Sequence, residues 1–323
     1  MKILVIGGTS FVGRAIVNAG VSAGHDMTVL NRGQTPTDLP SSVTRLVGDR
    51  HGDMSALRDH TFDATIDAIA YQRRDVESLA EALGDRGGHY LQISSVSAYQ
   101  EPATSRADES TPLLELGNTD PNAEVGFGTY GVLKAECERT ALRLFGDSSA
   151  IVRPTYVIGS HDKTMRFPYW VHRIKQGGTV AFPGPRASAL QWIDARDLGE
   201  FVIHLSTHRF AGAVHTCTPA GGLAFGDLLE EIARCVAPSG TTLVEIEPSR
   251  LEGSPLAGKF PLWSGGFSPS VLALDNASAL SLGLSTRPLA DSIADTEAWL
   301  GSQSVPAHWL SHTDETALLS AQD

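Results

Sequence analysis

The first half of the chain alternates short apolar runs, rich in β-branched residues, with longer stretches that have helical periodicity. The short runs predict strands at residues 2–6, 27–30, 43–47, 64–67, 89–93 and 150–152. The longer stretches predict helices at residues 11–23, 54–59, 74–83 and 131–145. Apolar runs without polar alternation indicate strands that are buried on both faces. Six such strands joined by helical crossovers predict an α/β fold with a doubly wound parallel sheet of the Rossmann type.

The second half of the chain has a less regular pattern. Apolar positions at helical spacing predict helices at residues 166–176, 195–206, 225–235 and 289–300, and shorter runs predict strands at 214–216 and 243–246. Glycine, proline and serine are frequent between residues 253 and 269, which predicts a surface loop. The polar end of the chain after Ser302 is expected to fray. The second half is therefore predicted to form a smaller α/β unit.

The composition is typical of a globular protein, with 41% hydrophobic and 19% charged residues. No run of about 18 apolar residues is present, so we expect no membrane-spanning helix. The apolar N-terminal run ends at Gly7 without a cleavage site, and we interpret it as a strand rather than a signal peptide. Cys137, Cys217 and Cys235 have neither a disulfide nor a metal-ligand spacing. We therefore expect a reducing, cytoplasmic location.

The chain is acidic, with a formal net charge of −12 and a sequence pI of about 5.3. An acidic surface repels phosphate backbones unless it carries a local basic patch. The densest basic pair is Arg73 with Arg74, which we interpret as the solvated start of a helix. His204 and His208 are four residues apart on a predicted helix, but no third metal ligand stands near them. We therefore expect the partner to be a small-molecule substrate and expect no nucleic acid, no membrane and no metal to bind.

A glycine-rich segment, residues 7–13, lies between the first predicted strand and the first predicted helix. Glycines let the backbone approach a pyrophosphate, and the N–H groups at the start of the following helix point at the anion. The position between a strand and a helix is what separates this motif from an ordinary turn. Ser10 stands where the middle glycine is expected, which makes the approach less open but adds a hydroxyl that can bind phosphate. The segment predicts a dinucleotide site.

The end of the second predicted strand bears on which nicotinamide cofactor binds. An acidic residue there would accept hydrogen bonds from the adenosine ribose and favour NAD. This chain has Asn31 followed by Arg32, and no carboxylate follows until Asp38. An arginine fork can hold a 2′-phosphate. The sequence therefore predicts NADP, with NAD as the less favoured cofactor.

Tyr130 and Lys134 are four residues apart, which puts both side chains on one face of a predicted helix. An isolated tyrosine has a pKa of about 10, too high for a base near neutrality. A neighbouring ammonium and a positive nicotinamide ring favour the phenolate. Tyr130 is thus predicted to exchange a proton while the cofactor carries the hydride. The spacing alone is common on helix surfaces, and its specificity comes from its position in the chain.

That position follows a fifth predicted strand, which ends just before Ser94, Ser95 and Ser97. In open α/β sheets, ligands bind at the carboxyl ends of the strands. A serine there can hydrogen-bond the reacting oxygen and hold it near the tyrosine. On chemistry alone, all three serines are candidates for this role.

With these elements in this order, the chain resembles an extended short-chain dehydrogenase/reductase of the NAD-dependent epimerase/dehydratase family. The matching stretches are residues 7–13, 48–49, 94–99, 130–134, 152–159, 192–197, 282–284, 287–289 and 299–300. The resemblance implies that Ser95, Tyr130 and Lys134 are the catalytic residues. It also implies that Asp49 reaches the adenine amino group and that Pro154 passes beside the nicotinamide. The expected cofactor contacts are Gly7, Thr9, Ser10, Phe11, Val12, Gly13, Asn31, Arg32, Asp49, Ala70, Tyr130, Lys134 and Pro154.

Two features depart from the family members that act on nucleotide sugars. Those proteins tend to place an arginine just before the stretch 192–197, whereas this chain has Leu190 and Gln191, with Arg186 out of register. The glycine-rich turn and the Asn31-Arg32 pair are closer to an atypical subgroup, which includes the chloroplast stem-loop-binding proteins. The resemblance therefore leaves the substrate open while implying the dinucleotide and the catalytic trio.

These observations predict an NADP(H)-dependent oxidoreductase or epimerase that transfers hydride at a secondary alcohol or ketone carbon, with Tyr130 as acid and base. One alternative is a nucleotide-sugar epimerase or dehydratase. Another is a non-enzymatic member of the same fold that senses NADP and binds RNA or another protein. We expect residues 1–155, completed by about 195–218, to bind the dinucleotide. Residues 156–194 and 219–305 are expected to bind substrate and 306–323 to form a tail, and the resemblance implies a homodimer.

Overall fold

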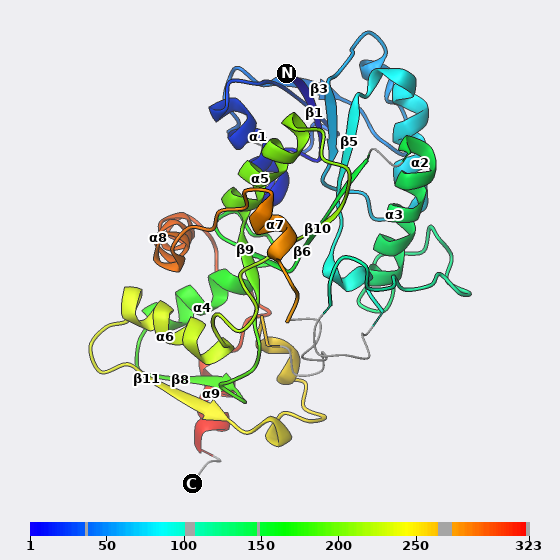
Figure 1. Ribbon diagram of the computed structural model, residues 1–323. Coiled ribbons are helices and arrows are strands. Elements are labelled where there is room, and N and C mark those ends of the chain that lie inside the picture. The colour runs from blue at the N-terminus through cyan, green and yellow to red at the C-terminus, as the bar shows by residue number, and fades with distance from the viewer. Residues whose placement is uncertain (36–37, 101–106, 147–148, 264–272, 321–323) are drawn as a thin grey trace.

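The computed structural model describes residues 1–35, 38–100, 107–146, 149–263 and 273–320 (Figure 1). Its central sheet has seven parallel strands in the order β10-β6-β5-β4-β1-β2-β3. Because the strand order reverses between β1 and β4, the sheet has its switch point there, where doubly wound folds bind ligands. The predicted doubly wound parallel sheet is confirmed. The strands are β1 (Lys2–Ile6), β2 (Asp26–Asn31), β3 (Thr44–Val47), β4 (Ala64–Asp67), β5 (His89–Ile93), β6 (Ala150–Pro154) and β10 (Gly212–Thr216).

Helices cover both faces of the sheet (Figure 1). On one face, α1 (Phe11–Ser22) packs along α5 (Ala195–Thr207), and on the other face α2 (Arg73–Leu83) packs against α3 (Tyr130–Phe145). Alternate residues of β1 belong to two different cores, Ile3 to the α1 side and Leu4 to the α2 side. Burial on both faces explains why the inner strands have no polar alternation, whereas the edge strand β3 is mostly exposed.

A smaller lobe lies below the sheet in Figure 1 and has a core of its own. This core is rich in aromatic side chains, and the Trp170 and Phe225 rings meet edge to face with centroids 5.5 Å apart. Two short parallel pairs, β8 with β11 and β7 with β9, accompany the helices. The elements are β7 (Tyr156–Ile158), α4 (Arg166–Lys175), β8 (Thr179–Pro183), β9 (Trp192–Asp194), α6 (Phe225–Val236), β11 (Thr242–Ile246), α8 (Leu289–Leu300) and α9 (His312–Ser320). The short helix α7 (Ala277–Ser281) instead packs beside β10, and its Ala279 belongs to the core of the sheet.

The structure differs from the sequence predictions in several elements. The predicted helix at residues 54–59 is only the 3-10 turn η1 (Ser55–Leu57). The elements β7, β8, β9, α7 and α9 were not predicted at all. Residues 253–263 form turns and the 3-10 helix η5 (Ala257–Lys259), as predicted, but the segment is not confined to the surface, because Phe260 and Leu262 are buried in the core of the smaller lobe. The rest of that predicted loop, residues 264–269, lies outside the described residues.

The polar tail, which we expected to fray after Ser302, contains helix α9. Glu315 in this helix is only 2% exposed, and Leu318 is buried with it. The Glu315 carboxylate lies 2.7 Å from Nε of Arg173 in α4, and it also accepts a hydrogen bond from the Ala181 N–H. The helix is therefore held by contacts with residues more than 130 positions away, which the local sequence pattern cannot show.

Candidate active site

The glycine-rich turn after β1 has the geometry of a phosphate cradle. Gly7 adopts a positive φ of 84°, and a Cβ atom on Gly13 would lie 2.1 Å from the Gly7 carbonyl oxygen. Ser10 caps α1 in an extended conformation, and its side chain makes no hydrogen bond to the helix backbone. The first N–H groups of α1 thus lack a side-chain cap, and the positive end of the helix dipole is directed at the turn. These residues fit a dinucleotide pyrophosphate.

The end of β2 presents an arginine at the surface. Asn31 closes the turn by accepting a hydrogen bond from the Gly33 N–H at 2.8 Å. Arg32 is exposed and has no ion-pair partner among the described residues. The Asp38 carboxylate is bound by Arg14 of α1, with Nη2 3.0 Å from Oδ2. Because Asp38 is committed to Arg14, the Arg32 guanidinium is left available to a ligand.

Three further residues expected to contact the cofactor lie at or just after the carboxyl ends of β3, β4 and β6. Asp49 lies exposed after β3, and one of its oxygens accepts a hydrogen bond from the His51 N–H at 3.0 Å. Ala70 follows β4 and is fully buried, and Pro154 is the buried last residue of β6. In a parallel sheet these ends share one edge with the glycine-rich turn. The structure therefore brings the predicted cofactor contacts to the same edge.

Lys134 is buried at this edge, with 2% of its surface exposed. Its Nζ donates hydrogen bonds to the Ala70 carbonyl at 2.8 Å and to the Ile93 carbonyl at 2.9 Å. The same Nζ lies 5.9 Å from the centroid of the Tyr130 ring. The ammonium thus joins the ends of β4 and β5 to helix α3, directly beside the tyrosine.

The three candidate serines have different partners. The Ser94 hydroxyl donates a hydrogen bond to the buried Glu138 carboxylate, so it is committed to α3. The Ser95 hydroxyl accepts a hydrogen bond from the Ser97 N–H at 3.1 Å and so caps the 3-10 turn η3 (Val96–Ala98). Ser97 itself is exposed. Within the part of the chain that the structure describes, Ser95 and Ser97 are therefore the two of these serines without a carboxylate partner.

Gly131 brings the turn after Ser95 and the start of α3 together. A Cβ atom at this position would lie 2.2 Å from the Ser97 carbonyl oxygen. Only a residue without a side chain allows this approach. Since Tyr130 is the first residue of α3, the contact places the tyrosine beside η3.

A buried polar network behind Ser94 was not predicted from the sequence. Arg153 of β6 binds Glu138 with Nη2 2.6 Å from Oε2, and its Nη1 donates to the Tyr99 hydroxyl at 2.6 Å. That hydroxyl lies 2.5 Å from Nε2 of His215 in β10. Burial raises the pKa of Tyr99 and lowers the pKa of His215, so both are neutral at pH 7. The signal that could have revealed the network is an arginine inside an otherwise apolar buried strand.

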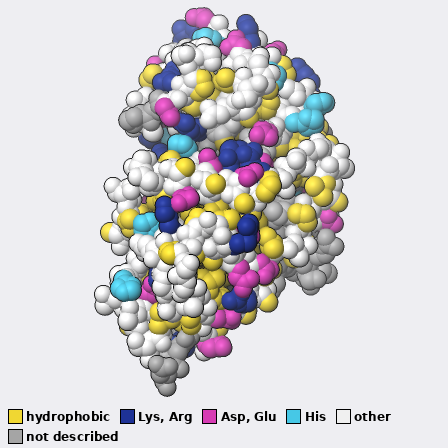
Figure 2. All heavy atoms as spheres, turned by 90° about the vertical axis from the view of Figure 1, so that its left-hand side faces the viewer, with side chains coloured by type: hydrophobic (Ala, Val, Ile, Leu, Met, Phe, Trp, Pro, Cys, Tyr) yellow, Lys and Arg dark blue, Asp and Glu magenta, His cyan; other side chains and the backbone are white. Residues whose placement is uncertain are grey.

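The molecular surface carries mixed charge on the side where α6 and α8 lie. On this face, Lys and Arg side chains are interspersed with Asp and Glu side chains (Figure 2). An interspersed pattern gives no continuous basic surface to a phosphate backbone. The expectation that the protein binds no nucleic acid stays a prediction.

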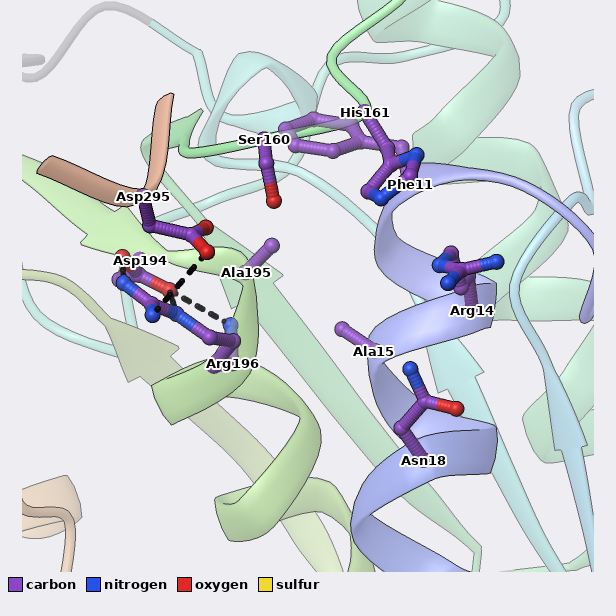
Figure 3. Close-up of a pocket in the computed structure, with 10 residues that line it drawn as sticks. All are labelled: Phe11, Arg14, Ala15, Asn18, Ser160, His161, Asp194, Ala195, Arg196 and Asp295. Atoms are coloured by element: carbon purple, nitrogen blue, oxygen red, sulfur yellow. Dashed lines mark hydrogen bonds and ion pairs between the residues drawn. The ribbon is translucent and has the colours of Figure 1, made fainter. Parts of the chain in front are cut away.

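A hollow of about 230 Å³ lies beside the glycine-rich turn, between the first turns of α1 and α5 (Figure 3). Arg14 on one wall is bound to Asp38, and Arg196 on the other has Nη2 2.8 Å from Oδ2 of Asp194. Burial lowers the pKa of His161, which favours its neutral ring. The arginines that line this hollow are therefore neutralised by carboxylates, which disfavours it as the site of an anionic substrate group.

Several predictions about metal ligands, membrane spans and the diphosphate position can be compared with the structure. In the described residues, no three His, Cys, Asp or Glu side chains come close enough to hold a metal ion, and no helix has the length and hydropathy needed to cross a membrane. The His204 and His208 rings lie against each other with centroids 4.1 Å apart. Leu190, at the position where the sugar-nucleotide relatives tend to have arginine, is 3% exposed.

Solved structures share this architecture over nearly the whole chain. The enzyme WbmH from Bordetella bronchiseptica, solved in complex with NAD+, superposes with a TM-score of 0.72 at 15% identity, over 94% of this chain and 99% of the other. The UDP-N-acetylglucosamine 4-epimerase from Bacillus cereus superposes with a TM-score of 0.67 at 16% identity, over 96% of this chain and 100% of the other. At these identities the likeness establishes the fold.

Relatives are also found by sequence. The chloroplast stem-loop binding protein of 41 kDa b from Arabidopsis thaliana is 24% identical over 253 residues, which is 68% of this chain and 63% of that protein. The match therefore spans less than two thirds of the plant protein. An epimerase family protein from Bos taurus is 25% identical over 68% of this chain and 75% of its own length. The profile of the NAD dependent epimerase/dehydratase family matches residues 3–216. The chain belongs to the NAD dependent epimerase/dehydratase family.

Proposed function

We propose that this protein is an NADP(H)-dependent oxidoreductase or epimerase that acts at a secondary alcohol or ketone carbon. One arrangement carries the proposal. Tyr130 begins the helix that contacts the turn after Ser95, and the buried Lys134 ammonium is 5.9 Å from its ring. A phenol, a hydroxyl and a cation at the carboxyl ends of the strands form a set that moves a proton at a substrate oxygen.

Each member of the set has a separate role in the proposal. When bound, the dinucleotide supplies the hydride acceptor or donor. Tyr130 takes the proton from the substrate hydroxyl, or returns it to the carbonyl oxygen in the reverse direction. Ser95 holds that oxygen by a hydrogen bond. The charge of the buried Lys134 attracts the developing phenolate, and this attraction is stronger than it would be for an ammonium in open water.

The proposed cofactor preference rests on the chain's own residues. The family is described as NAD dependent, and WbmH was solved with NAD+. In this chain, however, the end of β2 carries the exposed Arg32 and no acidic residue. A guanidinium there pairs with a 2′-phosphate, which supports NADP over NAD.

The proposed substrate is a secondary alcohol or ketone that carries no nucleotide. The Bacillus cereus structure supports the alternative, a nucleotide-sugar epimerase. Against it stands Leu190, an apolar and buried side chain that cannot grip a diphosphate. We propose that the substrate is bound between the sheet edge and the smaller lobe, by residues from 156–194 and 219–305. The predicted cytoplasmic location and homodimer stay predictions.

Tyr130→Phe tests the catalytic proposal, because the variant keeps the ring and removes the exchangeable proton. We expect turnover to fall by roughly 10²- to 10⁴-fold, as for loss of a general acid and base. Affinity for NADPH, measured by its fluorescence, should change little. Turnover is followed with NADP+ or NADPH on a panel of secondary alcohols, ketones and nucleotide sugars.

Two outcomes would count against the proposal. Equal turnover in wild type and Tyr130→Phe would remove the tyrosine from the reaction. Wild-type protein that turns over no panel member but binds RNA in high salt would favour the non-enzymatic alternative. The name of the Arabidopsis relative motivates that alternative, while the net charge of −12 disfavours it.

A further inference from the structure

Tyr71, which belongs to no recognised motif, lies against the Lys134 ammonium. The Lys134 Nζ is 4.3 Å from the centroid of the Tyr71 ring, closer than the 5.9 Å to Tyr130. The two tyrosine rings are 6.3 Å apart and inclined at 45°. Tyr71 is 36% exposed, whereas Lys134 is 2% exposed. An aromatic ring at the surface thus covers a buried cation at the centre of the proposed site.

Within the described part of the chain, the hydrogen bonds of Lys134 leave one N–H of its ammonium free to face the Tyr71 ring. An ammonium has three N–H donors. Two of them bind the carbonyls of Ala70 and Ile93, and no third acceptor is found among the described residues. A cation within about 6 Å of an aromatic face is attracted by it, most strongly where water is excluded. The Tyr71 ring therefore supplies the third contact of the ammonium.

The backbone of Tyr71 is fixed, so the position of the ring is built into the fold. Its N–H donates a hydrogen bond to Oδ2 of Asp75 at 2.8 Å, and the same oxygen accepts from the Gln72 N–H at 2.9 Å. The other Asp75 oxygen lies 2.5 Å from Nε2 of His51. Arg50 holds the same loop by donating a hydrogen bond from Nη1 to the Ile69 carbonyl at 3.0 Å. The loop that carries the ring is thus held at several points.

We propose that Tyr71 is a positioning residue of the active site. Its ring holds the Lys134 ammonium in place and keeps water from it, so that the charge acts at full strength on Tyr130. In a water-filled site the same charge would be screened. The effect on turnover rests on the proposed function, but the contact between the ring and the ammonium does not.

The first test measures the ammonium directly and requires neither cofactor nor turnover. Wild type, Tyr71→Phe and Tyr71→Leu are treated briefly with an amine-reactive ester, and modification at each lysine is followed by peptide mass spectrometry. Lys163 and Lys175, which are exposed, serve as internal references. We expect Lys134 to react roughly tenfold faster in Tyr71→Leu, since a shielding contact of this kind corresponds to about that factor. Tyr71→Phe, which keeps the ring, should match wild type.

The second test measures the consequence for the reaction. In Tyr71→Leu we expect kcat/KM to fall roughly tenfold or more, and in Tyr71→Phe the ring should rescue most of this loss. Unfolding midpoints in denaturant check that both variants are folded, and Tyr71→Met provides a second variant without the ring.

The outcomes separate this inference from the proposed function. Equal labelling of Lys134 in the Leu, Met and Phe variants would overturn the role of the ring. An equal loss of kcat/KM in the Phe and Leu variants would also overturn it, because the hydroxyl rather than the ring would then matter. If wild type shows no turnover on the panel, the proposed function fails, and the labelling rates still decide whether Tyr71 holds the ammonium.

Discussion

At the residue scale, the exposed guanidinium of Arg32 is the side chain on which the NADP proposal depends. Arg32→Ala removes a charged partner of a 2′-phosphate, so affinity for NADPH should fall by roughly 10- to 100-fold. Affinity for NADH, which has no such phosphate, should stay nearly constant. Fluorescence titration of both reduced cofactors measures the ratio. Arg58→Ala removes another exposed arginine and is the matched control. Equal wild-type affinities for the two cofactors would contradict the proposal.

The relative placement of two residues follows from the sequence where both lie within one motif. Tyr130 and Lys134 share a turn of one helix, and their relation follows from helical geometry alone. The chemistry of the residues left Ser94 and Ser95 equivalent, and only the family resemblance selected Ser95. In the structure the two are distinguished by the Glu138 carboxylate, 44 positions from Ser94. Tyr71 was missed for the same reason, since its partner Lys134 is distant in the chain. Contacts between elements carry no local signal.

At the element scale, Gly131 controls how closely α3 approaches the turn after Ser95. Alanine is the better helix former, by about 1 kcal/mol. The added Cβ, however, would lie 2.2 Å from the Ser97 carbonyl and 3.0 Å from the Leu114 side chain. We expect Gly131→Ala to lower the free energy of unfolding by about 1–3 kcal/mol through overpacking, and to lower turnover because Tyr130 moves from Ser95.

The control for this prediction is Gly128→Ala, three residues earlier in the same segment. A Cβ at Gly128 meets no atom within 4 Å, so its stability should change by less than about 0.5 kcal/mol. Denaturant unfolding followed by circular dichroism compares the two variants with wild type. A Gly131→Ala protein as stable and active as Gly128→Ala would show that α3 does not need this close contact.

The elements that were predicted correctly are those whose burial produces a clear pattern in their own residues. β1, β4 and β5 lie inside the sheet, and their apolar runs predicted the observed bounds. β7 and β9 have three residues each and, among the described residues, pair only with one another, so their runs are too short to stand out. Residues 54–59 include Ala, Leu and Arg, which favour helices, but the stretch forms only η1, because 3-10 turns share much of the helical pattern.

At the scale of the whole molecule, the alternation of strands and helices was sufficient to predict the doubly wound sheet. The rules for parallel sheets allow few topologies for such an alternation, and the observed order follows them. The smaller lobe could not be predicted in the same way. Its core collects residues from segments as distant as α4 and α9, and its two-stranded sheet joins β8 to β11 across the intervening helices. Such an assembly depends on long-range packing rather than on a repeated local unit.

The pairing of α9 with α4 gives a prediction for the stability of this lobe. Glu315 neutralises the buried Arg173, whose Nη atoms are bound to the carbonyls of Gly177 and Thr179. Glu315→Ala would leave that buried charge unpaired and the Ala181 N–H without its acceptor. We therefore expect the free energy of unfolding to fall by about 3–5 kcal/mol.

Glu297→Ala is the matched control, because Glu297 forms a largely exposed pair with Lys175 at 2.8 Å. Such a pair contributes only about 0–1 kcal/mol, since water screens both charges. Urea unfolding measures both variants, and limited proteolysis reports whether α9 has separated from the lobe. A loss of less than 1 kcal/mol in Glu315→Ala would mean that apolar contacts such as those of Leu318, rather than the buried ion pair, hold α9 in place.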